Sequence, residues 1–340
     1  MKHLRTSCTP PHSPGRGRLL AGLLALALLS ALCSLCLGPV ALAPAEVLAA
    51  LFGRLKGSAA AIVLHVRLPR TLGCLTAGMC LAVSGAIIQG VLANPLAAPN
   101  IIGVNAGAGL LVAVSCAIAP SAAALTPWMA FLGAMAGVLL VLAIAERAGA
   151  ARITLVLAGV AISGMFSAGI DAVITFVPDA LNGYSDFRIG GFANLTMDQV
   201  RPALAVAALG LLAALSLSNE LDLLTLGADT AQSLGLPAKG FRLLLLGVAA
   251  MLAGAAVSFA GLLGFVGLIV PHILRRLIGE ESRPRLAASA LGGANLVTLC
   301  DLLSRLLFAP YELPVGVVLS LTGGPFFLWL LLKQRGGRRV

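Results

Sequence analysis

The most informative segment of the sequence is Ser84–Gly109, SGAIIQGVLANPLAAPNIIGVNAGAG. Two apolar helical runs meet in it at a turn that holds Pro95 and Pro99. Proline disfavours helix at the residue before it, so the turn must be sharp. Glycine, alanine and the amides Gln89 and Asn94 stand where a lipid-facing helix would carry Leu, Ile and Val. Because small residues let helices approach closely and buried amides need partners, the stretch predicts a pore or a subunit surface rather than a lipid anchor.

The composition of the whole chain is that of a polytopic membrane protein. Of the 340 residues, 59% are hydrophobic and 11% are charged, whereas soluble domains carry roughly 25% charged residues. A membrane-spanning helix needs about 20 apolar residues, so the chain can hold about ten spans joined by short loops. We therefore predict an all-α fold with spans at 19–43, 68–92, 100–119, 126–145, 153–177, 201–218, 242–260, 262–279, 286–308 and 313–332.

The predicted span 262–279 differs from the others. Glycine recurs at every third position, at Gly261, Gly264 and Gly267, and the run stops at Pro271. Glycine and proline loosen a helix where other protein can cover the exposed backbone. We expect a broken or re-entrant span here.

Basic residues predict the orientation in the membrane. The formal net charge is +10. With a cytoplasmic N-terminus, sixteen of the 23 Lys and Arg residues fall on the cytoplasmic side, as the positive-inside rule requires. The positive charge therefore indicates membrane topology rather than nucleic-acid binding. Both termini are then cytoplasmic. We expect residues 1–18 to form a disordered tail and residues 19–335 a single transmembrane domain. The loop 44–70 breaks the rule, since it holds four of the seven outer basic residues and one acid, Glu46.

Several motifs resemble, in order and spacing, those of the FecCD-type membrane subunits of bacterial ABC importers. They are Arg67-Leu68-Pro69-Arg70, Ser84–Gly103 with Asn94-Pro95-Leu96-Ala97, Leu157–Ala161, Leu226-Gly227 with Leu234-Gly235, Phe265–His272, and Asp301 to Gly316. The resemblance covers nearly the whole chain after the N-terminal tail. It implies a type II ABC importer permease fold with ten helices per subunit. It also implies a multi-pass protein of the inner membrane that carries iron–siderophore complexes, haem or vitamin B12.

The resemblance implies a set of partners as well. These are a second permease subunit, identical or paralogous, two cytoplasmic ATPase subunits, an extracytoplasmic binding protein that delivers the ligand, and membrane lipid. Nucleic acid is not among them. The sequence has no P-loop G-x-x-x-x-G-K-[ST] and no catalytic or metal-ligand constellation. We expect the chain to be no enzyme and to hold no cofactor, with ATP and Mg²⁺ on the separate ATPase.

By the same resemblance, Arg67, Arg70 and Arg305 face outward and meet acidic residues of the binding protein. Arginine forms bidentate pairs with carboxylates and steers an acidic partner towards its surface. Such a role would explain the basic outer loop. Snorkelling of the arginines to the membrane interface is an alternative. For Arg305 a pair with Asp301, four residues earlier on one helix, is another.

The loop 219–241 is the longest predicted cytoplasmic connection. In the family, two short helices here seat in a groove of the ATPase and pass its motion to the pore as rigid-body movement. We expect helix periodicity that places Leu226, Ala231 and Leu234 on one compact face. An ordinary amphipathic connector is the alternative. The predicted coupling residues are Leu226, Gly227, Ala231, Leu234 and Gly235.

Four further residues are predicted to line the pathway or to pack helices together: Gln89, Asn94, Pro95 and Asp171. Asp171 stands out, because a carboxylate inside an apolar run is costly and faces protein or a wet cavity. It is interpreted as a pathway residue, as a buried partner of Ser163 or Ser167, or as a residue near the outer mouth.

The residues and the resemblance together predict a permease subunit that passes an iron–siderophore, or a related metal chelate, across the inner membrane. Haem and vitamin B12 are alternative cargoes. The outer loop 178–200 keeps the glycine turn of the family but lacks its tryptophan, which weakens the choice of cargo. An ion-coupled secondary transporter is the rival class, with Asp171 and Asp301 as its chief candidate acids.

Overall fold

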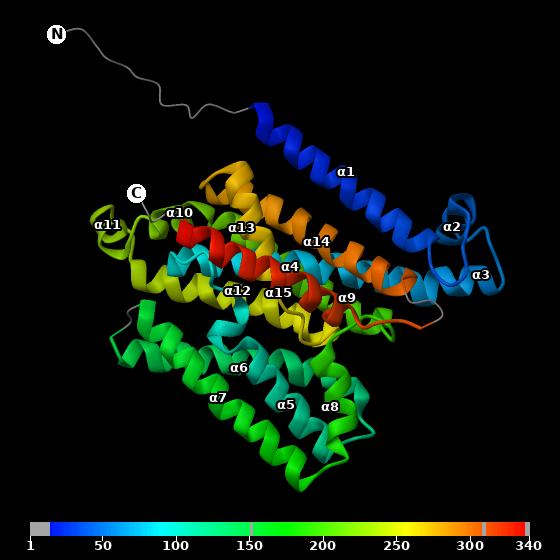
Figure 1. The fold of residues 1–340 in the computed structure, drawn as a ribbon, viewed down its shortest axis with the longest axis horizontal. Coiled ribbons are helices and arrows are strands. Elements are labelled where there is room, and N and C mark those ends of the chain that lie inside the picture. The colour runs from blue at the N-terminus through cyan, green and yellow to red at the C-terminus, as the bar shows by residue number, and fades with distance from the viewer. Residues whose placement is uncertain (1–13, 150–151, 308–310, 337–340) are drawn as a thin grey trace.

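The computed structural model describes residues 14–149, 152–307 and 311–336. These residues form helices joined by turns and extended linkers, and none of them lies in a strand, so the predicted all-α class is confirmed (Figure 1). The helices are α1 (Pro14–Cys36), α2 (Pro44–Leu51), α3 (Ser58–Ala61), α4 (Leu68–Leu92), α5 (Val104–Ile118), α6 (Thr126–Arg147), α7 (Arg152–Phe176), α8 (Ala180–Ile189), α9 (Met197–Ser216), α10 (Ser218–Thr225), α11 (Ala228–Ser233), α12 (Ala238–Ala260), α13 (Val266–Ile278), α14 (Ser282–Leu306) and α15 (Val315–Gly336).

Within the described ranges, seven helical stretches are long and apolar enough to cross a membrane. They include α1, α6, α7, α9, α12, α14 and one continuous stretch of 35 residues, Ser58–Leu92, that ends in α4. The other three predicted spans fall on α5, α13 and α15. Of these, α5 and α15 contain shorter apolar helices and α13 has 13 residues. That these three also cross the membrane stays a prediction.

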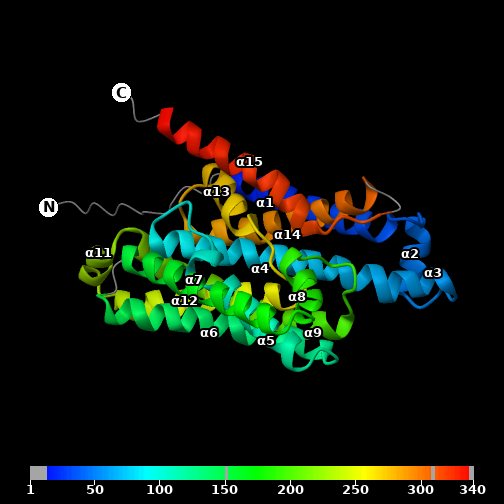
Figure 2. The same cartoon turned by 60° about the horizontal axis from the view of Figure 1, so that its bottom comes forward.

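Helix α4 is the centre of the packing. It lies between α14 and α12 and is buried along most of its length (Figures 1 and 2). Glycines make this possible. A Cβ atom on Gly78 would lie 2.1 Å from the carbonyl oxygen of Gly293 on α14, and one on Gly85 would lie 1.8 Å from that of Gly267 on α13. The small residues predicted to let backbones approach therefore do so inside one subunit.

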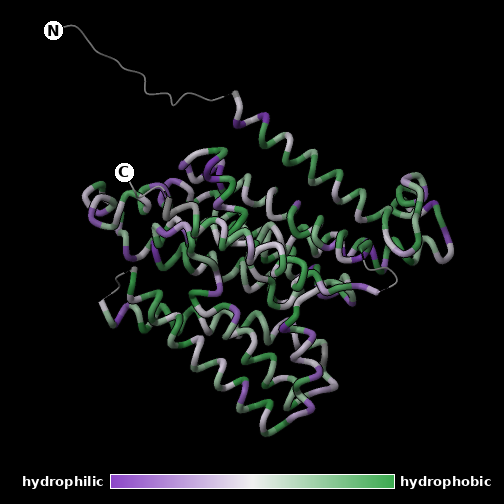
Figure 3. Tube along the Cα trace, viewed as in Figure 1, coloured by the Kyte–Doolittle hydropathy of each residue, from purple (hydrophilic) through white to green (hydrophobic). Residues whose placement is uncertain are grey.

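The segments with predicted cytoplasmic loops share one end of the bundle. The start of α1, the end of α15 and the α10–α11 connection all lie at this end, called the α11 end below, and α2 and α3 lie at the opposite α3 end (Figure 1). Two ion pairs lie at helix ends at the α11 end, Arg16 to Glu281 at 2.5 Å and Lys239 to Glu146 at 2.9 Å. Hydrophilic residues gather mostly at the helix ends, as Figure 3 shows.

The predicted first span and first loop need correction. Helix α1 begins at Pro14, so residues 14–18 are helical rather than disordered, and residues 1–13 lie outside the described part of the chain. It ends at Cys36 instead of residue 43. The predicted loop 44–70 holds α2, α3 and a π-helical turn, Ile62–Arg67, that runs into α4. Short helices of four to eight residues have too few turns to show a periodic pattern in the sequence.

The predicted span 262–279 is shortened at its start rather than interrupted, and that it is re-entrant stays a prediction. Residues 261–265 are not helical, and α13 starts only at Val266 after Phe265, which has a φ of 65°. A bulky residue in this left-handed region is strained and persists only where packing holds it. A Cβ on Gly323 of α15 would lie 2.4 Å from Phe265 Cγ, so the Phe265 ring occupies the space that a side chain at position 323 would take. Helix α13 continues past Pro271 to Ile278, one residue before the predicted end of the span.

Candidate functional site

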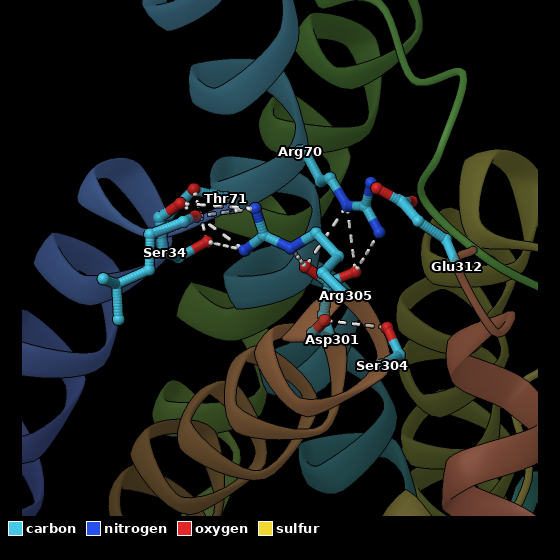
Figure 4. Close-up of polar contacts among 8 residues, drawn as sticks. Ser34, Arg70, Thr71, Asp301, Ser304, Arg305 and Glu312 are labelled. Carbon is cyan, nitrogen blue, oxygen red and sulfur yellow. Dashed lines mark hydrogen bonds and ion pairs between the residues drawn. The ribbon is translucent and has the colours of Figure 1, made fainter. Parts of the chain in front are cut away.

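Charged side chains form a cluster at the α3 end (Figure 4). Arg70 comes from α4, and Asp301 and Arg305 from α14. Asp301 is fully buried, and Arg70 Nε donates to both of its carboxylate oxygens, at 3.0 and 3.2 Å. Arg305 Nε lies 3.1 Å from Asp301 Oδ2 on the other side. Glu312, in the linker before α15, accepts from Arg70 through its Oε2 at 2.8 Å. One buried carboxylate thus joins two guanidinium groups.

The carboxyl end of α1 is held by two arginines. Arg67 donates to the carbonyl oxygens of Leu35 and Cys36, both at 2.8 Å, and also to that of Val40. Arg305 donates to Ser34 Oγ at 2.9 Å and to the Leu37 carbonyl at 3.3 Å. The last carbonyls of a helix lack partners within it, and positive charge there is favourable. These contacts fix a peripheral helix to α4 and α14.

The three predicted docking arginines are therefore buried, with exposed fractions of 4, 6 and 3% for Arg67, Arg70 and Arg305. Each of them donates hydrogen bonds to groups of the same chain. The alternative contact expected between Arg305 and Asp301 is present. That the arginines also meet a binding protein stays a prediction. Sequence reasoning did not assign Glu312 or Ser34 a role, although Glu312 belongs to a motif that was recognised.

A cavity of about 490 Å³ opens beside this cluster. Its wall includes Arg70, Glu312, α8, the start of α9, the end of α12 and the start of α15. The glycine turn predicted in the loop 178–200 forms one edge. Gly191 N donates to the Ala260 carbonyl at 2.9 Å, and Gly316 N donates to the Gly190 carbonyl at 3.3 Å. The turn consequently ties the end of α12 to the beginning of α15.

The amides of the Ser84–Gly109 stretch have structural contacts. Gln89 is buried, and its Nε2 donates to the carbonyls of Gly267 and Leu268, each at 3.3 Å. The Gly267 carbonyl is the one that Pro271 leaves without a helical donor, which explains how α13 continues past the proline. Asn94 Oδ1 accepts from Leu96 N at 3.0 Å in the turn beside Pro95. Of the two interpretations, the contacts support packing.

The predicted coupling segment projects at the α11 end as two short helices, α10 and α11 (Figure 1). Leu226 and Leu234 are 62 and 61% exposed, whereas Ala231 is fully buried. The expected common face is therefore wrong. Gly227, with a φ of 113°, separates α10 from α11, and Gly235, with a φ of 87°, follows α11. The resemblance implied two short helices here, and two are present; the break between them turns the two leucines to the surface while Ala231 packs inward.

The coupling segment is anchored to the bundle through α10. Leu221 is fully buried, and a Cβ on Gly90 of α4 would lie 2.8 Å from its Cδ1. Asp222 Oδ1 accepts from the backbone N of Ser282, the first residue of α14, at 2.8 Å. A carboxylate at the amino end of a helix satisfies a free donor and favours the helix dipole. Movement of α10 would therefore act directly on α4 and α14.

Asp171 is exposed on α7, so its interpretation as a buried partner of Ser163 or Ser167 is wrong. The exposed face of α7 around it carries Gly164, Ala168 and Thr175. Burial raises the pKa of Tyr184 on α8; nearby Arg188 opposes this shift and the negative charge of Asp171 adds to it. Asp171 thus lies near α8 at the α3 end. A carboxylate on a membrane helix needs protein or water beside it rather than lipid.

Comparison with known proteins places this architecture in one group. Residues 25–333 match the profile of the FecCD transport family. The hemin transport system permease protein of Yersinia pestis is 38% identical, over 82% of this chain and 85% of its own length. An Fe(3+)-citrate import system permease protein of Bacillus subtilis is 39% identical, with 81% and 82% covered. The vitamin B12 import system permease protein of Klebsiella pneumoniae is 37% identical, with 94% and 95% covered.

The fold has counterparts among solved structures. A metal-chelate type ABC transporter in an inward-facing conformation superposes with a TM-score of 0.83 and 28% identity, covering 93% of this chain and 99% of its own. PsaBC from Streptococcus pneumoniae superposes with a TM-score of 0.57 at 18% identity, which reflects a shared fold. The same helical framework therefore occurs at low sequence identity.

Proposed function

The chain belongs to the FecCD transport family, and we propose that it is the membrane-spanning permease subunit of an ATP-driven importer. The observation that carries this proposal is the α10–α11 segment. It exposes Leu226 and Leu234 at the end of the bundle where the loops rich in Lys and Arg lie, and it is anchored to α4 and α14. Exposed apolar side chains on a braced segment suit the groove of a cytoplasmic ATPase. The α11 end is then cytoplasmic, as the positive-inside rule requires.

The proposed cargo is an iron–siderophore or a related metal chelate. Support comes from relatives that import Fe(3+)-citrate and iron(3+)-hydroxamate. Haem and vitamin B12 are the alternatives, since relatives of similar identity import them. The pathway would run beside α7. Around Asp171 its exposed face carries the small residues Gly164 and Ala168, and the large apolar residues Leu157, Val160 and Met165 are exposed on the same helix. The carboxylate suits contact with water, and the small and apolar residues suit contact with a second permease subunit.

Reconstitution in proteoliposomes tests the proposal. The permease is combined with the ATPase subunits and the extracytoplasmic binding protein encoded next to it, and uptake of a ⁵⁵Fe-labelled chelate is measured with and without ATP. We expect uptake only with ATP and with all components present. A matched ATPase variant that lacks the P-loop lysine should abolish it. Uptake that proceeds without ATP hydrolysis would refute an ATP-driven importer.

The same assay addresses the rival class. An ion-coupled transporter would depend on its intramembrane acids, and Asp171 is the exposed candidate. We expect Asp171→Asn to leave the ATP dependence of uptake intact and to leave uptake insensitive to an imposed proton or sodium gradient. Loss of gradient-driven uptake in this variant would favour the secondary transporter.

A further inference from the structure

The two acids that contact Arg70 differ in accessibility. Asp301 is fully buried and is shared with Arg305, so another carboxylate could reach its place only by breaking the core. The side chain of Glu312 is 32% exposed and contacts the opposite edge of the guanidinium group, through NH1 at 2.8 Å. One edge of Arg70 is therefore fixed inside the bundle, and the other is covered by an acid that solvent can reach.

The cluster around Asp301 has more buried positive charge than buried negative charge, which favours the binding of a second acid. Arg67, Arg70 and Arg305 are all buried at this end, and Asp301 is the carboxylate buried among them. Buried cations require partners, because an unpaired charge in a poorly solvated site is costly. Glu312 supplies the further negative charge from the linker before α15. Any other carboxylate that approached Arg70 from outside could supply the same negative charge.

We infer that Glu312 is an exchangeable occupant of Arg70, which an acidic side chain of the extracytoplasmic binding protein displaces when it docks. This inference rests on the proposed importer function and adds a regulatory step to its docking surface. Arginine presents separate pairs of donors, so one edge can change partner while the other stays on Asp301. The exchange swaps one carboxylate for another and leaves the charge of the cluster unchanged.

The exchange at Glu312 can affect the cavity through the start of α15. Glu312 is three residues before α15, and Gly316 in the first turn of α15 donates to the Gly190 carbonyl at 3.3 Å. A Cβ on Gly316 would lie 2.0 Å from the Ile189 carbonyl, so this helix start is tightly seated against the end of α8. Release of Glu312 removes a side-chain contact of the linker before α15 and leaves it held by the hydrogen bond from Leu313 N to the Ser304 carbonyl at 3.3 Å. Docking would thereby loosen the wall of the 490 Å³ cavity.

Arginine labelling of the full-length permease in nanodiscs tests the first step without any partner. Phenylglyoxal reacts with accessible guanidinium groups, and mass spectrometry reports the rate at each arginine. In Glu312→Gln, which removes the charge and keeps the size, we expect Arg70 to react at least about threefold faster, as expected from loss of a partly exposed ion pair. Arg67 and Arg305 should keep their rates, because their contacts do not involve Glu312.

The matched control is Asp198→Asn. This acid lies at the same end, its side chain is 92% exposed, and its contact is with Arg201 at 3.9 Å. It removes the same charge without touching the cluster, and Arg70 should react as in the wild type. An unchanged Arg70 rate in Glu312→Gln would overturn the inference. Equally faster reaction of all three arginines would also overturn it, because Glu312 would then be a structural brace.

The second step is measured with the binding protein that supports uptake in the reconstituted importer. We expect Glu312→Gln to bind it about three- to tenfold more tightly, a change of affinity that one partly exposed ion pair can supply. A structural brace would instead weaken binding. If no binding protein supports uptake, the proposed function fails, while the labelling experiment still decides whether Glu312 covers Arg70. Unchanged or weaker binding with normal uptake refutes the exchange alone.

Discussion

At the scale of single residues, Asp301 is the most sensitive position of the charge cluster. We expect Asp301→Asn to lower the free energy of unfolding by about 3–5 kcal/mol, because it leaves Arg70 and Arg305 buried without their shared carboxylate. Thermal unfolding in detergent measures this. Asp198→Asn makes the same chemical change at an exposed site and should stay within about 0.5 kcal/mol of the wild type. Equal stability of the two variants would contradict the account of the cluster.

The sequence could predict part of this cluster. The pair between Asp301 and Arg305 follows from a spacing of four residues on one helix, and it was foreseen as an alternative. The pair between Arg70 and Asp301 joins residues 231 positions apart, and no local pattern reports such a contact. The basic residues predicted an outward surface, which stays a prediction, and the fold shows in addition that Arg67 and Arg305 hold the end of α1.

At the scale of elements, Gln89 and Pro271 form one unit that lets α13 cross its own proline. We expect Gln89→Leu to destabilise the protein by about 1–3 kcal/mol, because it leaves the Gly267 carbonyl buried without a donor. Pro271→Ala supplies a backbone N–H for the same carbonyl. The double variant should therefore lose less stability than the sum of the single ones. Strict additivity in a double-mutant cycle of thermal unfolding would show that the two residues are independent.

Glycine contacts between elements give a second test. A Cβ at Gly85 would lie 1.8 Å from the Gly267 carbonyl, so Gly85→Ala must push α4 and α13 apart, and we expect a loss above about 3 kcal/mol. Gly247→Ala on α12 meets no atom within 4 Å and should be neutral or slightly stabilising through helix propensity. Thermal unfolding of both variants measures the difference. Equal stability of the two variants would show that the close approach of α4 and α13 does not contribute to stability.

Elements were predicted well where the apolar pattern was long. The bounds of α4 agree with the predicted span 68–92, since a long apolar run with a proline near its start defines a helix clearly. The helices α2 and α3 were not predicted, because pieces this short carry no periodic signal. Gly227 separates the two expected helices of the coupling segment, and only the fold shows which leucines face outward.

At the scale of the whole molecule, the count of basic residues identified which loops share one end, because positive charge follows sidedness rather than local structure. The contact between Arg16 and Glu281 agrees with that grouping. The proposed attachment of the ATPase at the α11 end depends on it. Substitutions of exposed residues can disturb attachment of the ATPase without disturbing the folding of the permease, so they separate the two effects.

We expect Leu226→Ser together with Leu234→Ser to reduce ATP-dependent uptake about tenfold or more, as truncation of central apolar anchors does at interfaces. Both side chains are more than 60% exposed, so the thermal midpoint of the isolated permease should hardly change. The matched control is Leu181→Ser on α8, 44% exposed at the opposite end, which should keep ATPase binding in co-purification. If Leu181→Ser releases the ATPase and the double variant retains it, the α3 end and not the α11 end faces the cytoplasm.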